Sequence, residues 1–434
     1  MKRIRTFWKK IPLQVLLWLK WLLFVGCVIA LVFTLAEINT RLIVEEKNSN
    51  ELYATWYGFR AFLAEGKNPY GTEMQSRIVN SAADEGIRLD ETSTYLKSPL
   101  YGIIVYLPFV LFREFRFAYT WWLTFLELAA VFIVLLGVSF IKRNIKRNAV
   151  YVIFASILMF SSLAFMTGIG YGAPAILAFL ILLGSLKALQ SGGDELTGVL
   201  LSLITVFPII GWISMVFIII WAIRQKRNKV LWWFLGTIVL LGFAVALLEP
   251  QWLLLYLQMW VRYFKVVEVG FILNILESVF PSTFLLPGFI TVVLAALLIL
   301  EWGFSRHKEF ILFYWTFSLT LVLETLLTMN IALVNVIFIP ITLTFLQVVW
   351  EDRWKKKGRI VGVAVSLLTI GFPWIMDTAL GDRGPVQTLA IVSVTAIMLL
   401  VNLYWIRWWL TKNVLLWHSD AYSLEESNQG LGDA

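Results

Sequence analysis

Three acidic side chains follow the first apolar run of the sequence, namely Glu45, Glu46 and Glu51. A carboxylate at a membrane surface is placed to accept the proton of a hydroxyl group that a lipid delivers there, which is the task of a general base. Acidic residues also lie most often on the solvated surface of a protein. The residue types and their position therefore leave two interpretations open, a general base or an ordinary surface acid.

Three further acids, Glu127, Glu301 and Glu324, lie within apolar runs. A charge in the hydrocarbon region is costly and needs a partner or a functional role. The polar residues that follow Glu324 in the sequence are Thr325, Asn330 and Asn335. We interpret this polar group either as the wall of a site or as hydrogen-bonding side chains that hold helices together.

Other kinds of catalysis lack the residues that they need. His307 and His418 are the only histidines, and their positions exclude a Ser/His/Asp arrangement and a Cys/His zinc cluster. Cys27 is the only cysteine, which excludes a disulfide scaffold. The glycines of 168–172 lack the Lys-Ser/Thr pair of a phosphate-binding loop and favour close helix packing or a kink. We expect no cofactor, and the sequence leaves a divalent metal open.

The composition indicates the solvent in which these groups work. Of 434 residues, 59% are hydrophobic and only 15% are charged, with a net charge of +8 and a mean hydropathy of +0.79. An ordinary soluble domain is more polar than this. The basic residues form short clusters between apolar runs, a pattern typical of cytoplasmic helix ends and not of a nucleic-acid-binding protein. We predict one transmembrane domain over 1–412 and a cytoplasmic tail over 413–434.

The apolar runs predict an all-α polytopic membrane protein with about 12 transmembrane helices. The first run, 13–36, follows five basic residues and is too long for a signal-peptide core, so we expect an uncleaved anchor and a cytoplasmic N-terminus. The later runs lie near 117–140, 149–166, 174–189, 197–223, 230–248, 282–303, 308–328, 331–350, 359–379 and 387–406.

Two arrangements of these runs give the same number of crossings. In the first, 99–112 is re-entrant and 197–223 is a hairpin broken at Pro208, which places 23 Lys and Arg residues inside and 12 outside. In the second, 99–112 crosses and 197–223 is one helix. The charge rule prefers the first by a few residues. Both arrangements place the C-terminus in the cytoplasm.

Two outer loops differ from the apolar runs. Loop 37–98 has 62 residues with 10 acidic and 7 basic side chains, and a loop of this length usually has a function. Its apolar residues at helical spacing predict an amphipathic helix on the membrane surface; they are Leu52, Trp56, Phe59 and Leu63. Loop 249–281 predicts a second such helix, with Arg262 and Lys265 placed to meet a lipid phosphate. The alternative is that both loops only cover the helix ends.

The stretch 50–112 resembles a known family. The run from Glu51 to Tyr70 contains an acid, paired aromatics, small residues and then Gly-Lys-Asn-Pro-Tyr, and Tyr95-Leu-Lys-Ser-Pro99 and Tyr106-Leu-Pro108 follow. This order is similar to the first outer loop of the family 87 glycosyltransferases, in the glycosyltransferase-C superfamily. The similarity is strongest over 50–140 and looser at 192–198, at Phe207-Pro208 and at 335–340.

The resemblance implies a transferase that moves a sugar from a polyprenyl-phosphate carrier to a glycolipid or glycan at the outer face of the cell membrane, with inversion. The family's catalytic acid, an Asp, corresponds to Glu51, whose side chain is one methylene longer. The family's Gly-Gln and Lys-Pro pairs are Gly170-Tyr171 and Phe207-Pro208 here, which removes one cation. The residues that we expect to contact substrate are Tyr57, Arg60, Asn68, Tyr70, Tyr95, Lys97, Arg262, Lys265 and Asn335.

Two other functions remain open. Many spans and the intramembrane acids Glu127 and Glu324 also suit a transporter or flippase for a lipid-linked glycan, although the long acidic loop does not. The departures from the family pattern also suit an inactive relative that acts as an assembly partner. The partners expected for the enzyme are the lipid-linked sugar donor, the acceptor and membrane lipids.

Overall fold

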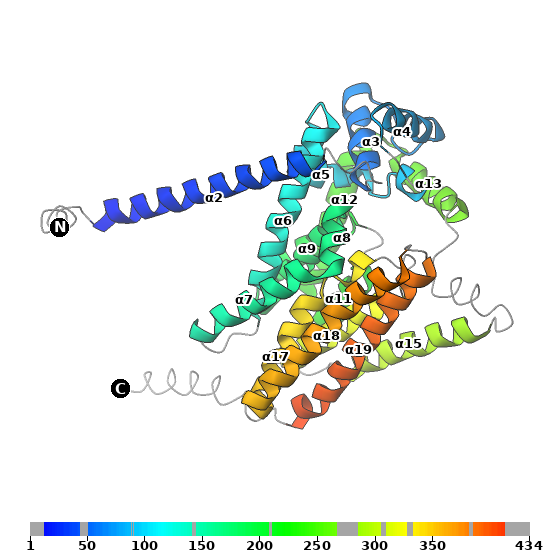
Figure 1. Ribbon diagram of the computed structural model, residues 1–434. Coiled ribbons are helices and arrows are strands. Elements are labelled where there is room, and N and C mark those ends of the chain that lie inside the picture. Colours follow the sequence, from blue (N-terminus) through cyan, green and yellow to red (C-terminus); the bar gives the residue numbers. More distant parts are fainter. Residues whose placement is uncertain are drawn as a thin grey trace, which may run out of the picture.

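The computed structural model describes residues 13–43, 51–87, 89, 91–140, 145–207, 211–266, 285–304, 310–327, 333–381 and 385–412. These residues form helices and no strand (Figure 1). The predicted tail 413–434 and the acids Glu45 and Glu46 lie outside the described residues, as does Asn330. The all-α prediction is thus confirmed for the part of the chain that the structure describes.

Within the residues that the structure describes, six helices, or parts of them, are long and apolar enough to cross a membrane, and they belong to α2, α6, α12, α17, α18 and α19. Their bounds are Leu13–Ile43, Phe115–Ser139, Asn228–Ala246, Ile339–Trp354, Lys356–Leu380 and Pro385–Lys412, the span on α17 beginning at Val334. A seventh span results if α7 (Ile145–Ser161) and α8 (Leu163–Gly170), which are bent by 58°, count as one. The chain is therefore a multi-pass membrane protein by helix length and composition.

Among the described residues, four further apolar helices are shorter, apart from the apolar stretch Leu100–Val110, and they are α9 (Ala175–Gln190), α11 (Trp212–Arg224), α15 (Leu285–Phe304) and α16 (Phe310–Leu327). Each falls within one of the predicted apolar runs. The count of about 12 crossings stays a prediction, because these four are too short or too incompletely described to meet the same length criterion.

The two segments on which the alternative arrangements differ are both interrupted. Segment 99–112 forms a 3₁₀ turn, η2 (Leu100–Gly102), and the eight-residue helix α5 (Ile103–Val110). Eight residues span about 12 Å, well short of the roughly 30 Å of a hydrocarbon core. Segment 197–223 is divided between α10 (Asp194–Ile204) and α11. An interrupted 197–223 is what the first arrangement predicts, with Pro208 itself outside the described residues, and the re-entrant course of 99–112 stays a prediction.

A group of short helices lies together at one end of the molecule, with α3, α4 and α13 at the top of Figure 1. We call this group the cap; it consists of α3 (Glu51–Glu65), α4 (Thr72–Asp84), the 3₁₀ turn η1 (Glu91–Thr94), η2, α5 and α13 (Trp252–Val266). The cap therefore joins the two predicted outer loops, which are far apart in the sequence.

The amphipathic helix predicted in loop 37–98 is α3, but its apolar side does not face lipid. Leu52, Trp56 and Phe59 are buried inside the protein, and only Leu63 is exposed. Phe59 contacts the Tyr106 ring of α5, with 5.8 Å between ring centroids. The prediction of a surface-lying helix is wrong for this side, because helical periodicity identifies an apolar face without identifying what covers it.

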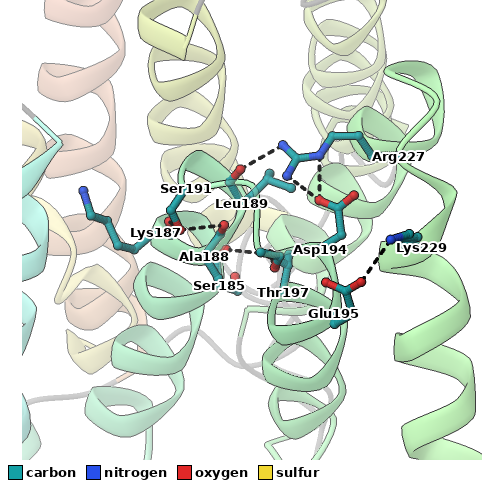
Figure 2. A network of polar contacts seen from close by, with 11 residues as sticks. Ser185, Lys187, Ala188, Leu189, Ser191, Asp194, Glu195, Thr197, Arg227 and Lys229 are labelled. Atoms are coloured by element: carbon teal, nitrogen blue, oxygen red, sulfur yellow. Dashed lines mark hydrogen bonds and ion pairs between the residues drawn. The ribbon is translucent and has the colours of Figure 1, made fainter.

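The N-terminal end of helix α12 is fixed by a group of charged residues that we call the latch; they are Asp194, Glu195, Arg227 and Lys229 (Figure 2). Arg227 donates through Nε to Asp194 Oδ1 at 2.7 Å and through Nη1 to Leu189 O at 2.8 Å, and Lys229 pairs with Glu195 at 3.2 Å. These contacts tie the turn between α9 and α10 to the start of α12.

Glycines allow the helices beside the latch and at the α17–α18 turn to approach closely. A Cβ on Gly198 would lie 2.5 Å from Val230 O, and one on Gly358 would lie 1.9 Å from Trp350 O. Gly362, one turn after Gly358, would meet the Gln347 side chain in the same way. Small residues four apart are a common device for close helix contact in membranes.

The buried acids of the bundle have partners. Asn39 Nδ2 donates to Glu127 Oε2 at 3.2 Å, which ties the last turns of α2 to α6. Glu301 accepts from Tyr404 at 3.1 Å and pairs with Arg407 at 2.9 Å. The remainder of α2 extends away from the other helices, and the side chains described along it are almost all exposed (Figure 1).

Candidate functional site

The predicted general base, Glu51, is the first residue of α3, and its side chain is outside the described part of the structure. The helical register places residue 51 one turn before Thr55 and two turns before Gly58. A Cβ on Gly58 would contact Leu96 Cδ2 at 3.5 Å and Pro69 Cβ at 3.6 Å, so α3 packs against the cap interior at Gly58. The catalytic role of Glu51 stays a prediction.

The turn after α3 is built by two of the predicted residues. The Asn68 side chain accepts a hydrogen bond from the Tyr70 backbone N–H at 2.9 Å, which is the usual role of Asn in a turn. Tyr70 is buried, and its hydroxyl donates to Ser98 O at 3.0 Å. Gly66 precedes the turn with a φ of +65°, a conformation that favours glycine. Asn68 therefore stabilises the turn, and its side-chain oxygen is bonded to the Tyr70 N–H.

The segment 95–98 is held between this turn and α13. Tyr256 of α13 donates to Lys97 O at 3.0 Å, and Arg262 Nη2 donates to Tyr70 O. The rings of Tyr95 and Tyr263 pack edge to face with 5.6 Å between centroids. The cap thus brings together four residues that the sequence predicted separately, namely Tyr70, Tyr95, Lys97 and Arg262.

The two cations of this cluster form no ion pair with an acid in the part of the chain that the structure describes. Lys97 Nζ lies 5.5 Å from the centroid of the Tyr263 ring, and neither Lys97 nor Arg262 forms an ion pair with any residue that the structure describes. Arg262 Nε is buried and has no hydrogen-bond partner among the described atoms. A buried donor without an acceptor costs free energy, and an anionic ligand would remove this cost. We call this group the cationic cluster.

The tyrosines around the cationic cluster are uncharged donors. Burial raises the pKa of the Tyr70 hydroxyl well above its ordinary value, and burial also raises the pKa of Tyr256. Both hydroxyls therefore remain protonated at physiological pH. The sequence analysis missed Tyr256 and Tyr263, although their spacing of seven residues on α13 places them on one side of that helix.

Three predicted residues lie outside the cationic cluster. Arg60 donates to Phe112 O at 3.3 Å and to Arg113 O, so it fixes the end of α5. Tyr57 stacks on Tyr53 with 6.2 Å between ring centroids. Lys265 is exposed near the end of α13. None of the three is brought to the cluster by the contacts that the structure describes.

A second polar group of the cap escaped the sequence analysis. The Tyr53 hydroxyl lies 2.9 Å from Ser81 Oγ and 3.2 Å from Glu85 Oε1. Burial raises the pKa of the Glu85 carboxyl, while the hydrogen bond from Tyr53 acts in the opposite direction. These contacts join α3 to the end of α4, and we assign them to the packing of the cap.

The tenth predicted site residue, Asn335, lies in a different place. It lines a small cavity between α9, the start of α11, the end of α16 and the 3₁₀ turn η3 (Leu333–Val336). The cavity is lined mainly by apolar side chains, and Glu324, Thr325 and Asn335 are its polar side chains. Glu324 and Asn335 are thus neighbours, as the sequence suggested.

Glu324 is held by the start of α11. Its carboxylate accepts from the backbone N–H groups of Ile213 and Ser214, each at 3.1 Å, and from the Ser214 hydroxyl at 2.5 Å. The residue before α11 is Gly211, which has a φ of +75° and no side chain to cap the helix. Glu324 supplies that cap from another helix, so at least part of its role is structural.

The break between α10 and α11 links the cavity to the cap. Thr205, just after α10, exchanges a hydrogen bond of 2.8 Å with Tyr101 of η2, and the Phe207 ring lies 6.3 Å from that of Tyr106 in α5. Gly211, a few residues further on, lines the cavity. The cavity therefore lies at the end of the bundle that carries the cap.

No group of three or more His, Cys, Asp or Glu side chains suited to a metal occurs among the residues that the structure describes. Comparisons with known proteins add no identification, since no family model, no curated protein and no solved structure matches the chain.

Proposed function

We propose that this protein is a membrane glycosyltransferase that takes a sugar from a polyprenyl-phosphate carrier and attaches it to a lipid or glycan acceptor. The observation that carries the proposal is the cationic cluster beside the helix that Glu51 begins. In it, two cations that pair with no acid among the described residues meet buried tyrosines. A phosphate group is the natural partner for such cations. The proposed site is at the outer face of the cell membrane, with both termini in the cytoplasm.

The proposed chemistry is a single displacement. The acceptor hydroxyl oxygen attacks the anomeric carbon, the bond from that carbon to the phosphate oxygen breaks, and polyprenyl phosphate leaves with the bonding electrons. Glu51 takes the hydroxyl proton as general base. Arg262 and Lys97 stabilise the charge that develops on the departing phosphate, and the tyrosine hydroxyls donate beside them. Attack from the face opposite the leaving group inverts the anomeric centre.

The test compares Glu51→Gln with the wild-type protein in vesicles that contain a radiolabelled polyprenyl-phosphate sugar. We expect the transfer rate to fall by about 100-fold or more, because general-base catalysis contributes roughly 100- to 10,000-fold. Glu73→Gln is the matched control, since Glu73 is an exposed acid on α4. Transfer by Glu51→Gln at the wild-type rate would refute the role of Glu51, and absence of transfer by the wild type with every carrier tested would refute the enzyme.

Two features favour a second function, the transport of a lipid-linked glycan. The cavity with Glu324 and the 58° bend between α7 and α8 are features that transporters also use. A fluorescent lipid-linked oligosaccharide distinguishes the two functions. Its movement across the bilayer, with no sugar transfer and no effect of Glu51→Gln, would favour transport, whereas an inactive assembly partner would show neither activity.

A further inference from the structure

A short, strongly basic turn joins helices α17 and α18 at the end of the molecule away from the cap (Figure 1). A single residue, Lys355, separates the two helices. Five of the seven residues from 353 to 359 are basic and exposed, and we call them the basic turn; they are Arg353, Lys355, Lys356, Lys357 and Arg359. Because one helix follows the other directly, these charges stay close together and are not spread along a loop.

Most cations of the basic turn form no ion pair among the described residues. Arg359 pairs with Glu351, and the four other cations pair with no acid that the structure describes. Within 340–370 the acids are Glu351 and Asp352, so the five basic side chains outnumber two acidic ones. The basic turn therefore has an excess of positive charge that an external anion can balance.

The latch is also a basic cluster in the sequence, but it differs from the basic turn in structure. There Arg227 pairs with Asp194 and Lys229 pairs with Glu195, so the chain itself supplies anions for these two cations (Figure 2). Two clusters of similar appearance in sequence thus differ in how they are neutralised. The basic turn keeps more of its charge available to a partner.

The backbone of Lys355 is strained for a residue that has a side chain. Its φ is +51° and its ψ is −120°, a conformation that glycine adopts more readily. Strained positions are found most often where a side chain has a function. The chain has a lysine where glycine would fit the backbone better, which favours a role for the charge itself.

Exposed apolar side chains lie directly beside the basic turn. Ile360 and Val361 follow it on α18, and Ile360 is 70% exposed. On α19, the Trp409 ring packs edge to face on Trp354 with 5.1 Å between centroids, and Arg353 lies 5.9 Å from the same Trp409 ring. Two further exposed rings of α19 are Trp405 and Trp408. Tryptophan favours the boundary between lipid and water, so this surface suits the headgroup region of a membrane.

Cations without acid partners beside an apolar surface match one class of ligand. A soluble anion would meet the cations alone, and a nucleic acid would leave the apolar side chains in water. A phospholipid with an anionic headgroup satisfies both, because its phosphate pairs with Lys or Arg while its acyl chains cover the apolar side chains. The helices on both sides of the turn are candidate membrane spans, which keeps the turn at the depth of the headgroups.

We propose that the basic turn binds an anionic phospholipid. The phosphate of the headgroup meets Lys356 and Lys357, and the acyl chains lie against Ile360 and the exposed tryptophans of α19. The binding goes beyond the proposed sugar transfer, because it uses the opposite end of the molecule from the cap (Figure 1).

The test uses the full-length protein in phosphatidylcholine nanodiscs that contain a phosphatidylglycerol with a diazirine in its acyl chain. After illumination, we expect adducts on the peptide that contains Ile360, and competition by unlabelled phosphatidylglycerol but not by inorganic phosphate. Lys356→Gln/Lys357→Gln should reduce these adducts about ten-fold or more, because each basic residue near an anionic lipid contributes about five-fold. The matched control is Lys226→Gln/Lys229→Gln, which removes two exposed cations at the latch end of α12 and should leave the adducts unchanged.

A second variant separates the charge from the fold of the turn. Lys355→Gly should lower the adducts about five-fold, as expected for the loss of one cation. The melting temperature should not fall, because glycine accepts a φ of +51° with less strain. A lower melting temperature with unchanged adducts would make Lys355 a structural residue and would contradict the proposal.

Three further outcomes would overturn the proposal. Wild-type labelling of Lys356→Gln/Lys357→Gln would show that these cations do not hold the lipid. Equal labelling by a diazirine phosphatidylcholine would show no preference for an anionic headgroup. Competition by inorganic phosphate as strong as that by phosphatidylglycerol would make the basic turn a site for soluble anions.

Discussion

Two arginines differ in how their charge is satisfied, Arg227 directly before helix α12 and Arg262 on α13, the next described helix. At the latch, Arg227 meets a carboxylate and a backbone carbonyl of its own chain (Figure 2). At the cap, Arg262 meets one carbonyl, and its buried Nε has no partner among the described atoms. The helix between them has 19 residues, which span about 28 Å. The comparison shows that one arginine is satisfied by its own chain, while the other keeps a buried donor for which the described residues supply no acceptor, and this difference underlies the proposed phosphate-binding role of Arg262.

The largest expected effect breaks the packing of the latch. Gly198→Leu places side-chain atoms against the α12 backbone, because even a Cβ would lie 2.5 Å from Val230 O. We expect a loss of about 3 kcal/mol in the free energy of unfolding, at the upper end of the usual cost of overpacking. Thermal unfolding in detergent measures it. Gly236→Leu is the control, since no atom lies within 4 Å of a Cβ there, and equal losses in both variants would contradict the comparison.

The next effect separates binding from packing at the cap. Arg262→Ala should lower the rate of sugar transfer about 100-fold, which corresponds to about 2.7 kcal/mol in the activation free energy. Kinetics in vesicles over a range of carrier concentrations measure this effect. The melting temperature should change much less than the rate. A large loss of stability with normal activity per folded molecule would make Arg262 a packing residue like Arg227.

The corresponding variant at the latch, Arg227→Ala, should lower stability and leave the transfer rate unchanged. Arg227→Ala removes the cation that faces Asp194 and leaves that partly buried carboxylate without its partner. We expect a loss of about 2 kcal/mol in stability, below the cost for a fully buried pair because both side chains keep some exposure. The transfer rate per folded molecule should remain at the wild-type value. A 100-fold loss of activity at normal stability would remove the distinction between the two arginines.

A smaller effect tests how α13 holds the cationic cluster. Tyr256→Phe removes the hydrogen bond to Lys97 O and preserves the ring. We expect a loss of about 1 kcal/mol in stability, which is typical of one neutral hydrogen bond. Hydrogen exchange of the 95–98 amides should accelerate in the variant. Unchanged exchange there would show that α13 does not hold this segment.

The smallest effect concerns exposed charges at the edge of the cap. Hydrogen bonds from Lys67 and Arg77 lower the pKa of the Glu65 carboxyl. Their contribution to stability is therefore present above the ordinary pKa of a glutamate and is lost as the pH falls through the lowered value. The difference in melting temperature between the wild type and Glu65→Gln should shrink toward zero with acidification. A difference that stays constant between neutral and acidic pH would contradict this coupling.

The sequence predicted most of the helices but not which segments pack against their apolar faces. Hydrophobic length located α6, α12, α18 and α19, because a membrane span needs a long apolar run. The periodicity of α3 was recognised correctly, yet its apolar side packs on segments as distant as α5, and no local pattern reports such a contact. The length of a run also failed to show that 197–223 forms two helices in place of one.

The candidate site was predictable in part. Residue type and loop position identified Arg262, the family resemblance identified Lys97, and the fold places both in one cluster. The resemblance also selected Asn68 and Arg60, whose side chains bond to backbone atoms of the cap. A polar side chain in a loop has the same appearance in sequence whether it faces a ligand or a neighbouring carbonyl. Only the hydrogen-bond partners distinguish these roles, and the partners depend on tertiary structure.

Helix α2 differs from the other helices in how little of it contacts the bundle. Among the contacts that the structure describes, its attachment to the bundle lies in its last turns, where Asn39 bonds to Thr124 and Glu127 and the Phe33 ring meets Trp121. The preceding side chains that are described expose an apolar surface on nearly every side. Such a surface needs shelter from water and no particular neighbour, so apolar exchanges before Phe33 should cost less stability than a substitution at Asn39.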